Sequence, residues 1–299
     1  MSCRFAPAGA IIAALLSGGV SAQSAQTPAR ISAEEQAEEE LRLTNALQSI
    51  EPQRPGVVDA YVISVSLDSD PVFNREAREA GRVLANRFGA AGRTVVLAGD
   101  EGMDSAQAIG SPKHLARALA RAADLMDEKE DVLVLYSTSH GSPKAGLNYR
   151  DTARGDAIVT PAQLSAILAE NHVDNRLIII QACFSGQFVP VLASPRTVIA
   201  TAASEFRSSF GCTADNDWTF FGYALINKAM RQPDTFVRQF RRAFVSIVGW
   251  ENQLRYEPSN PQISVGAETA GWLAALDARA DNAKGEPVGK PPSELEVQP

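Results

Sequence analysis

From Val57 onward, the hydrophobic pattern of the chain alternates between short apolar runs and longer stretches with helical periodicity. The strongest run is Leu177-Ile178-Ile179-Ile180, four large apolar residues of which three are β-branched. Such a run is typical of a strand buried on both faces of a parallel sheet. By this reasoning we predict strands over residues 61–66, 94–97, 131–139, 176–181, 196–201 and 262–265.

Helical periodicity fills most of the intervals between these strands. Helices are predicted over residues 73–88, 111–126, 160–170, 217–230 and 233–248. Ser111-Pro112 and Thr160-Pro161 each combine a capping residue with a first-turn proline. Residues 142–160 are expected to form a long polar loop, and loops of that length are often functional. Alternating strands and helices imply an α/β fold with a largely parallel sheet covered on both faces, as a single domain over residues 57–266.

The first 22 residues have the pattern of a cleaved signal peptide. Arg4 precedes an apolar run over residues 10–16, and Val20-Ser21-Ala22 provides a small-residue cleavage site. The run is shorter than the roughly 20 apolar residues of a membrane-spanning helix. We therefore expect an exported protein, periplasmic or secreted, with no membrane span in the mature chain.

Two further segments flank the predicted domain. Residues 23–56 are predicted to be an acidic helical and linker segment, with a partial apolar stripe of Leu41, Leu43, Leu47 and Ile50. A solvated helix outside the main domain is the favoured interpretation, and an inhibitory pro-segment is the alternative. Residues 267–299 are expected to form a C-terminal helix and, after Ala280, a disordered tail rich in Gly, Pro, Lys and Glu.

Composition narrows the range of functions. The 299 residues are 45% hydrophobic and 21% charged, which is ordinary for a globular protein. A net charge of −7 and a pI of about 5.1 argue against a nucleic-acid partner. The sequence lacks the motifs of serine hydrolases, zinc peptidases, phosphate-binding loops and Cys-x-x-Cys sites. No metal and no cofactor are expected.

Two chemically useful residues follow neighbouring strands. His140-Gly141 follows the run over residues 131–139, and Cys183 follows the run over residues 176–181. Open α/β sheets place ligands at the carboxyl ends of their strands. A thiol and an imidazole that face each other there form a nucleophile and its acid/base. The other two histidines, His114 and His172, are expected at the surface.

The residues around Cys183 and His140 resemble two related families of cysteine peptidases. Gln181-Ala182-Cys183 is similar to the caspase signature, in which a histidine lies about 50 residues upstream. The longer form Ala182-Cys183-Phe184-Ser185-Gly186 resembles the legumain family more closely. The resemblance runs from about Tyr61 to Met230, and it also rests on Ser139-His140-Gly141-Ser142, Ala200-Thr201-Ala202-Ala203, Ser208-Ser209-Phe210-Gly211-Cys212 and Thr219-Phe220-Phe221-Gly222.

This resemblance implies a caspase-like three-layer sandwich with a mostly parallel six-stranded sheet. It implies a cysteine endopeptidase that acts on peptide or protein substrates, with Cys183 as nucleophile and His140 as general acid/base. The N–H groups of Gly141 and Cys183 would bind the oxyanion. Two other functions stay open: a transamidase or ligase that uses the same residues, and a non-catalytic binding protein of the same fold.

The legumain pattern also points to a substrate pocket formed by Arg75, Gln181 and Ser208 or Ser209. This chain departs from the pattern at four positions. Gln181 replaces a Glu of the family, and Glu76 replaces a His. Tyr223 replaces an Asp, and Phe73 replaces the asparagine that orients the histidine. An Arg75 with fewer acidic neighbours could favour an acidic substrate side chain instead of asparagine.

Cys183 and Cys212 would be the two cysteines of the exported chain. Two cysteines do not make a disulfide framework, and a permanent bridge would inactivate the nucleophile. Cys212 matches a cysteine in the family motif and is expected to be a structural thiol. A reversible Cys183–Cys212 bridge is the alternative. The sequence does not indicate an oligomeric state.

Overall fold

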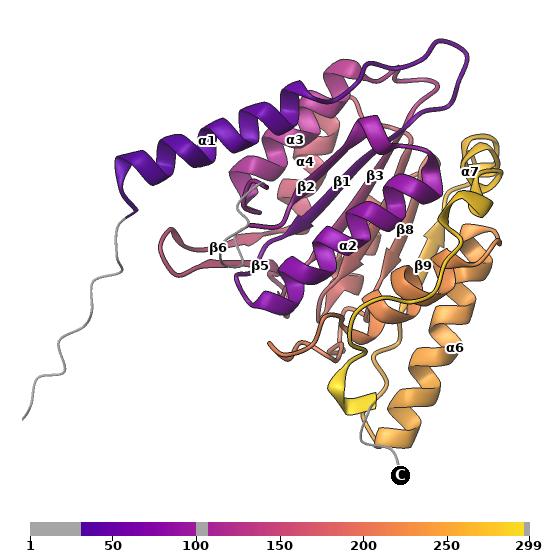
Figure 1. Ribbon diagram of the computed structural model, residues 1–299. Helices are drawn as coiled ribbons and strands as arrows, with labels where there is room; N and C mark the ends of the chain where they lie inside the picture. Colours follow the sequence, from indigo (N-terminus) through magenta and orange to yellow (C-terminus); the bar gives the residue numbers. More distant parts are fainter. Residues whose placement is uncertain (1–30, 100–106, 296–299) are drawn as a thin grey trace, which may run out of the picture.

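A computed structural model describes residues 31–99 and 107–295. Its centre is a six-stranded sheet with the strand order β2-β1-β3-β7-β8-β9 (Figure 1). Neighbouring strands are parallel except for the last pair, β8 and β9. The predicted α/β class, with six mostly parallel strands between helices, is confirmed.

The elements have the following bounds. The strands of the central sheet are β1 (Ala60–Ser66), β2 (Thr94–Leu97), β3 (Val132–Thr138), β7 (Arg176–Gln181), β8 (Thr197–Thr201) and β9 (Gln262–Val265). A small antiparallel sheet contains β4 (Gly141–Ser142), β5 (Gly146–Asp151) and β6 (Gly155–Val159). The α-helices are α1 (Ala33–Gln48), α2 (Pro71–Phe88), α3 (Pro112–Leu125), α4 (Pro161–Glu170), α5 (Val189–Leu192), α6 (Phe236–Leu254) and α7 (Ala270–Asp277).

Side chains of the central strands alternate between two hydrophobic cores. Along β7, Leu177 and Ile179 pack with α2, α6 and α7. Ile178 and Ile180 pack with α1, α3, α4 and α5 on the opposite face. All four side chains are fully buried, as the uninterrupted apolar run of β7 requires.

The region between β3 and α4 is an antiparallel hairpin rather than the expected loop. β5 and β6 pair from Leu147–Val159 to Asp151–Gly155, and Gly141 of β4 pairs with Leu147. Most side chains of β6 are exposed, so this strand lacks the apolar run by which the other strands were predicted. The hairpin stands directly after His140 in the chain.

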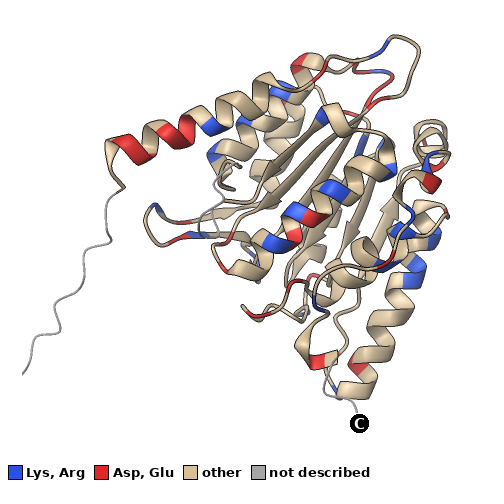
Figure 2. Ribbon diagram, viewed as in Figure 1, with Lys and Arg blue, Asp and Glu red and all other residues tan. Residues whose placement is uncertain are grey.

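Helix α1 packs on the main body, contrary to the prediction of a solvated helix outside it. Leu43 and Leu47 join the core that also includes Leu115 and Leu119 of α3, whereas Leu41 is 59% exposed. Figure 2 shows acidic residues gathered in the first half of α1. Two of them contact basic side chains or backbone of the α3 region: Glu40 pairs with Lys113 and Arg117, and Glu39 accepts the Ile109 N–H.

The C-terminal part also differs from the prediction. The expected helix over residues 217–230 begins at Phe220 and includes a π-helix, Gly222–Lys228. The stretch after Ala280 is held by polar contacts rather than disordered, as far as residue 295. Val288 donates to Asn227 Oδ1 and its carbonyl accepts from Trp218, and Ser293 N–H donates to Asn216. These partners lie far away in the sequence, so local composition did not reveal them.

The predicted signal peptide, residues 1–22, lies outside the described residues. No helix of the described part is long and apolar enough to cross a membrane.

Candidate active site

The register of the central sheet brings His140 and Cys183 to the same edge. Strands β3 and β7 are parallel neighbours, with Thr138 opposite Gln181. His140 and Cys183 each stand two residues beyond that pair. The Ser139 N–H donates to the Gln181 carbonyl at 3.1 Å, so the two backbone segments stay paired past the ends of β3 and β7. The predicted position of both residues at matched strand ends is therefore confirmed.

Gly141 permits a close approach between the two segments. A Cβ at this position would lie 2.0 Å from the Cys183 carbonyl oxygen, which is shorter than any non-bonded contact. Phe184, directly after the thiol, has a φ of +58°, and its N–H donates to the Arg207 carbonyl at 2.7 Å. A non-glycine residue in this region is uncommon and often marks a functional turn.

The Cys183 thiol faces the backbone of Ser209. The Ser209 N–H donates to Cys183 Sγ at 3.3 Å, and the Ser209 carbonyl lies 3.6 Å from the sulfur. These two backbone contacts fix the position of the sulfur at the end of β7. Ser209 is buried in this contact, whereas its neighbour Ser208 is exposed.

His140 is held by a carboxylate that the sequence analysis did not assign. Asp70 Oδ2 lies 2.9 Å from His140 Nε2. Asp70 precedes the first residue of α2, and its side chain makes no capping bond to that helix. The ring of Phe73 packs edge-on against the imidazole, with centroids 4.9 Å apart. His140 and Cys183 were identified because polar residues at the carboxyl ends of parallel strands often form the site. Asp70 follows the end of β1 by four residues, so the same reasoning points to it.

Asp68, two residues before Asp70, is nearly inaccessible at 2% exposure. Its Oδ1 accepts the Asp70 N–H at 3.1 Å, and no hydrogen-bond donor of the described residues reaches Oδ2. Burial raises the pKa of this carboxyl group. Asp68 thus fixes the backbone of the residue that orients His140.

Arg75 points to the loop after Cys212. Its guanidinium pairs with Asp217 at 3.0 Å and donates to the carbonyls of Ala214 and Asn216, the latter at 2.8 Å. The charge of Arg75 is thus balanced by a carboxylate that the sequence analysis did not consider. Its role in binding substrate remains a prediction.

The side chains of Gln181 and Glu76 both contact Thr138, near the end of β3. Both side chains are fully buried, and Thr138 Oγ1 donates to Glu76 Oε1 at 2.9 Å and lies 3.4 Å from Gln181 Oε1. Glu76 also accepts from Tyr136 and from the Thr219 N–H at 2.6 and 2.7 Å. Burial raises the pKa of Glu76, against the effect of these hydrogen bonds.

Two of the departures from the legumain pattern thus have a structural explanation. Glu76 places a carboxyl group next to Gln181, although Gln181 itself carries none. A Cβ at Gly222 would lie 2.2 Å from Glu76 Oε2, so the glycine makes room for this buried acid. Tyr223 packs on Trp250 and Lys228 instead.

The two described cysteines carry free thiols. Burial, and secondly the neighbouring Cys183, raise the pKa of Cys212 far above its usual range. Cys212 Sγ lies 3.9 Å from Gln181 Nε2. A thiol that remains protonated is a poor nucleophile, which supports the expected structural role of Cys212.

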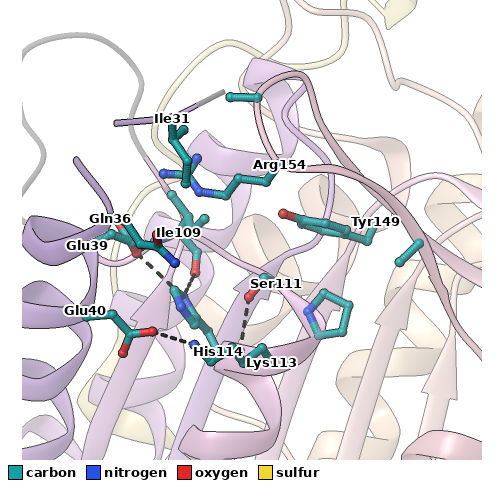
Figure 3. Close-up of a pocket in the computed structure, with 13 residues that line it drawn as sticks. Ile31, Gln36, Glu39, Glu40, Ile109, Ser111, Lys113, His114, Tyr149 and Arg154 are labelled. Atoms are coloured by element: carbon teal, nitrogen blue, oxygen red, sulfur yellow. Dashed lines mark hydrogen bonds and ion pairs between the residues drawn. The ribbon is translucent and has the colours of Figure 1, made fainter. Parts of the chain in front are cut away.

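A cavity of about 650 Å³ lies away from Cys183, between α1, the start of α3 and the β5–β6 hairpin (Figure 3). His114 borders it and is buried, not at the surface as predicted. Its Nδ1 lies 3.0 Å from the Ile109 carbonyl and 3.6 Å from Glu39. These contacts fix the start of α3 against α1, so His114 has a structural explanation. His172 is exposed, as expected.

Comparison with known proteins places this site in a family. The Peptidase C13 family matches residues 110–268, more than half of the chain, and that range includes His140 and Cys183. No curated protein matches the chain significantly. Caspase-1 from Spodoptera frugiperda, known from a crystal structure, is 14% identical; 73% of this chain and 93% of that chain are covered, with a TM-score of 0.45. A secreted C11 cysteine protease from Bacteroides thetaiotaomicron, solved with an irreversible peptide inhibitor, is 12% identical; 64% of this chain and 60% of that chain are covered, with a TM-score of 0.39.

Proposed function

This chain belongs to the Peptidase C13 family, the legumain family of cysteine peptidases, and from that premise we propose that it is an endopeptidase with Cys183 as nucleophile and His140 as general acid/base. The observation that supports this most strongly is the Asp70–His140 contact just past the end of β3, beside β7, which ends two residues before Cys183. The contact gives an imidazole that is 30% exposed a carboxylate that orients it, which is how the base of a nucleophile is held in such sites.

In the proposed reaction, His140 accepts the proton of the Cys183 thiol and the sulfur attacks the carbonyl carbon of the scissile amide. Because Asp70 occupies Nε2, the remaining ring nitrogen, Nδ1, exchanges protons with thiol and leaving group. Asp70 thereby selects one tautomer of the neutral ring and stabilises the imidazolium that forms.

The tetrahedral intermediate needs fixed donors for its negative oxygen. We assign this role to the N–H groups of Gly141 and Cys183, whose backbone segments approach closely because residue 141 has no Cβ. Collapse of the intermediate expels the amine, which His140 protonates, and leaves an acyl group on Cys183. Water then releases the acyl group, with His140 as base.

The charge balance around Arg75 supports a neutral polar preference in the substrate pocket rather than an acidic one. Asp217 neutralises the guanidinium, and the loop carbonyls take part of its hydrogen-bonding capacity. An acidic substrate side chain would have to compete with Asp217 for Arg75, whereas an amide side chain can donate to a carboxylate and accept from a guanidinium at once.

A proteome-derived peptide library incubated with the purified protein tests both parts of the proposal. Mass spectrometry is expected to find cleavage at internal bonds, most often after neutral polar residues. If no peptide is cleaved, the endopeptidase assignment is wrong. If cleavage occurs mainly after Asp or Glu, the protein is still an endopeptidase, but Asp217 does not prevent Arg75 from binding an acidic substrate side chain.

A further inference from the structure

His140 also belongs to a cluster of three potential metal ligands. One ligand atom from each of Asp68, Asp70 and His140 lies within 4.8 Å of the other two. Asp70 Oδ2 and His140 Nε2 lie 2.9 Å apart. The hydrogen bond from the Asp70 N–H to Asp68 Oδ1 holds the two carboxyl groups together on the loop between β1 and α2.

Asp68 provides an independent sign that this cluster lacks a partner. Its side chain is buried, and its Oδ2 accepts no hydrogen bond from the described residues. A buried carboxylate oxygen without a donor is costly. Asp68 also lines a polar cavity of about 210 Å³, together with Ser66 and Asn74. The side chains of His140 and Asp70 remain 30% and 41% exposed, so an ion from solvent can reach them.

The ligand types indicate which ion fits. One imidazole nitrogen and two carboxylate oxygens suit Zn²⁺, whereas Ca²⁺ and Mg²⁺ prefer oxygen ligands alone. Ligand atoms of tetrahedral zinc lie about 3.4 Å apart, given bonds of about 2.0–2.2 Å. The three ligand atoms lie within 4.8 Å of one another, a spread that side-chain rotation can close. We propose that Asp68, Asp70 and His140 form an inhibitory zinc site, with the fourth position open to water.

Zinc at this site would block the proposed reaction, and this consequence rests on the proposed function. To bind the metal, His140 must move its ring proton from Nε2, where it faces Asp70, to Nδ1 by exchange with solvent, and zinc then takes the freed lone pair of Nε2. A neutral imidazole bound through Nε2 carries its single proton on Nδ1. It therefore cannot accept the proton of Cys183, and the thiol stays unactivated. Inhibition would be reversible, because no covalent bond forms with the thiol.

Arg150 opposes the cation and offers a second way to test the site. It pairs with the Asp68 loop through its backbone: Ser69 N–H donates to the Arg150 carbonyl at 3.0 Å, and the Arg150 N–H to the Leu67 carbonyl at 3.0 Å. Its exposed side chain contributes positive charge near Asp68. Removal of that charge should strengthen zinc binding without changing a ligand.

Calorimetric titration of ZnCl₂ into the metal-free full-length Cys183→Ala protein measures binding without relying on catalysis. One ion per chain is expected. Asp68→Asn in the same background should weaken binding at least about tenfold, and Arg150→Gln should strengthen it. Asp174→Asn, at an exposed site elsewhere, is the matched control and should leave the affinity unchanged. Circular dichroism verifies that each variant is folded.

The proposal is overturned if Asp68→Asn and Arg150→Gln both bind zinc as the parent does. It is also overturned if the Cys183→Ala protein has lost the zinc binding of the wild type, because the ion would then sit on the thiol. In a parallel assay, zinc should inhibit peptide cleavage by the wild type, and EDTA should restore it. If the metal-free wild type cleaves no peptide, the proposed function fails while the calorimetric result still decides the zinc site.

Discussion

Two residues at the start of α2 hold the imidazole of His140 in place. Asp70 Oδ2 binds His140 Nε2, and the Phe73 ring packs against the edge of the imidazole. The first contact fixes the tautomer, and the second restricts the rotation of the ring. The family pattern pointed only to position 73 for this role. Because both residues lie at the start of α2, the packing of that helix on the sheet sets the orientation of the His140 ring.

Asp70→Asn should therefore lower kcat without raising KM. We expect a decrease of about 10- to 100-fold, smaller than the loss of a general acid/base would cause in an enzyme that depends on it. Asp70→Glu should recover part of the rate, because it restores the carboxylate. Steady-state kinetics on a cleaved peptide measures this, with Asp215→Asn on an exposed loop as the control. A rise in KM at constant kcat would show that Asp70 binds substrate instead.

At the scale of elements, α2 also inserts a buried acid beneath the active site. Glu76 contacts β3 through Tyr136 and Thr138 and the segment before the π-helix through the Thr219 N–H. Burial, the largest influence, raises the pKa of Glu76 above its ordinary value of 4.5. In the native state the group thus retains its proton at pH values where the unfolded chain has lost it.

This pKa shift predicts how stability depends on pH. From about pH 4.5 up to the raised pKa, the native state binds more protons than the unfolded state, so Glu76 makes the free energy of unfolding fall as pH rises. Glu76→Gln cannot titrate. The stability of the wild type relative to this variant should therefore decrease between about pH 5 and about pH 8.

Urea denaturation of both proteins at the two pH values tests this prediction, with Glu205→Gln at an exposed position as the control. A relative stability that increases with pH would contradict it. That outcome would mean that the three hydrogen bonds to Glu76 outweigh its desolvation.

Helix α1 is the other element whose role can be measured. Leu43 is completely buried against the core, and Leu41 on the same helix is 59% exposed. Leu43→Ala should lower the free energy of unfolding by about 2–5 kcal/mol through lost burial and a cavity. Leu41→Ala should change it by no more than about 0.5 kcal/mol. Equal, small effects in urea denaturation would mean that α1 is not part of the folded body.

Elements with a strong apolar period were predictable, and those defined by distant partners were not. β2 has the predicted bounds, and α4 ends at Glu170 as expected. The β5–β6 hairpin was missed because β6 is mostly exposed and lacks an apolar run. The stretch from residue 281 to 295 was predicted as disordered because its partners, Trp218 and Asn227, are remote in sequence.

For the whole molecule, the sequence predicted the sheet and the positions of His140 and Cys183 at its edge. Parallel strands that end in chemically useful residues bring them together whatever the details of the loops. The carboxylates that complete the site, Asp70 and Asp217, come from loops whose course the apolar pattern does not determine. The location of the site was therefore predictable from the sequence, whereas the charged and polar residues around it became visible only in the structure.

Peptide cleavage by two cysteine variants tests the role of Cys183 most directly. Cys183→Ala should abolish both cleavage and labelling by a thiol-reactive peptide probe, because it removes the nucleophile. Cys212→Ala, which removes a buried thiol that stays protonated, should retain both. Full cleavage activity in Cys183→Ala would show that Cys183 does not attack the substrate.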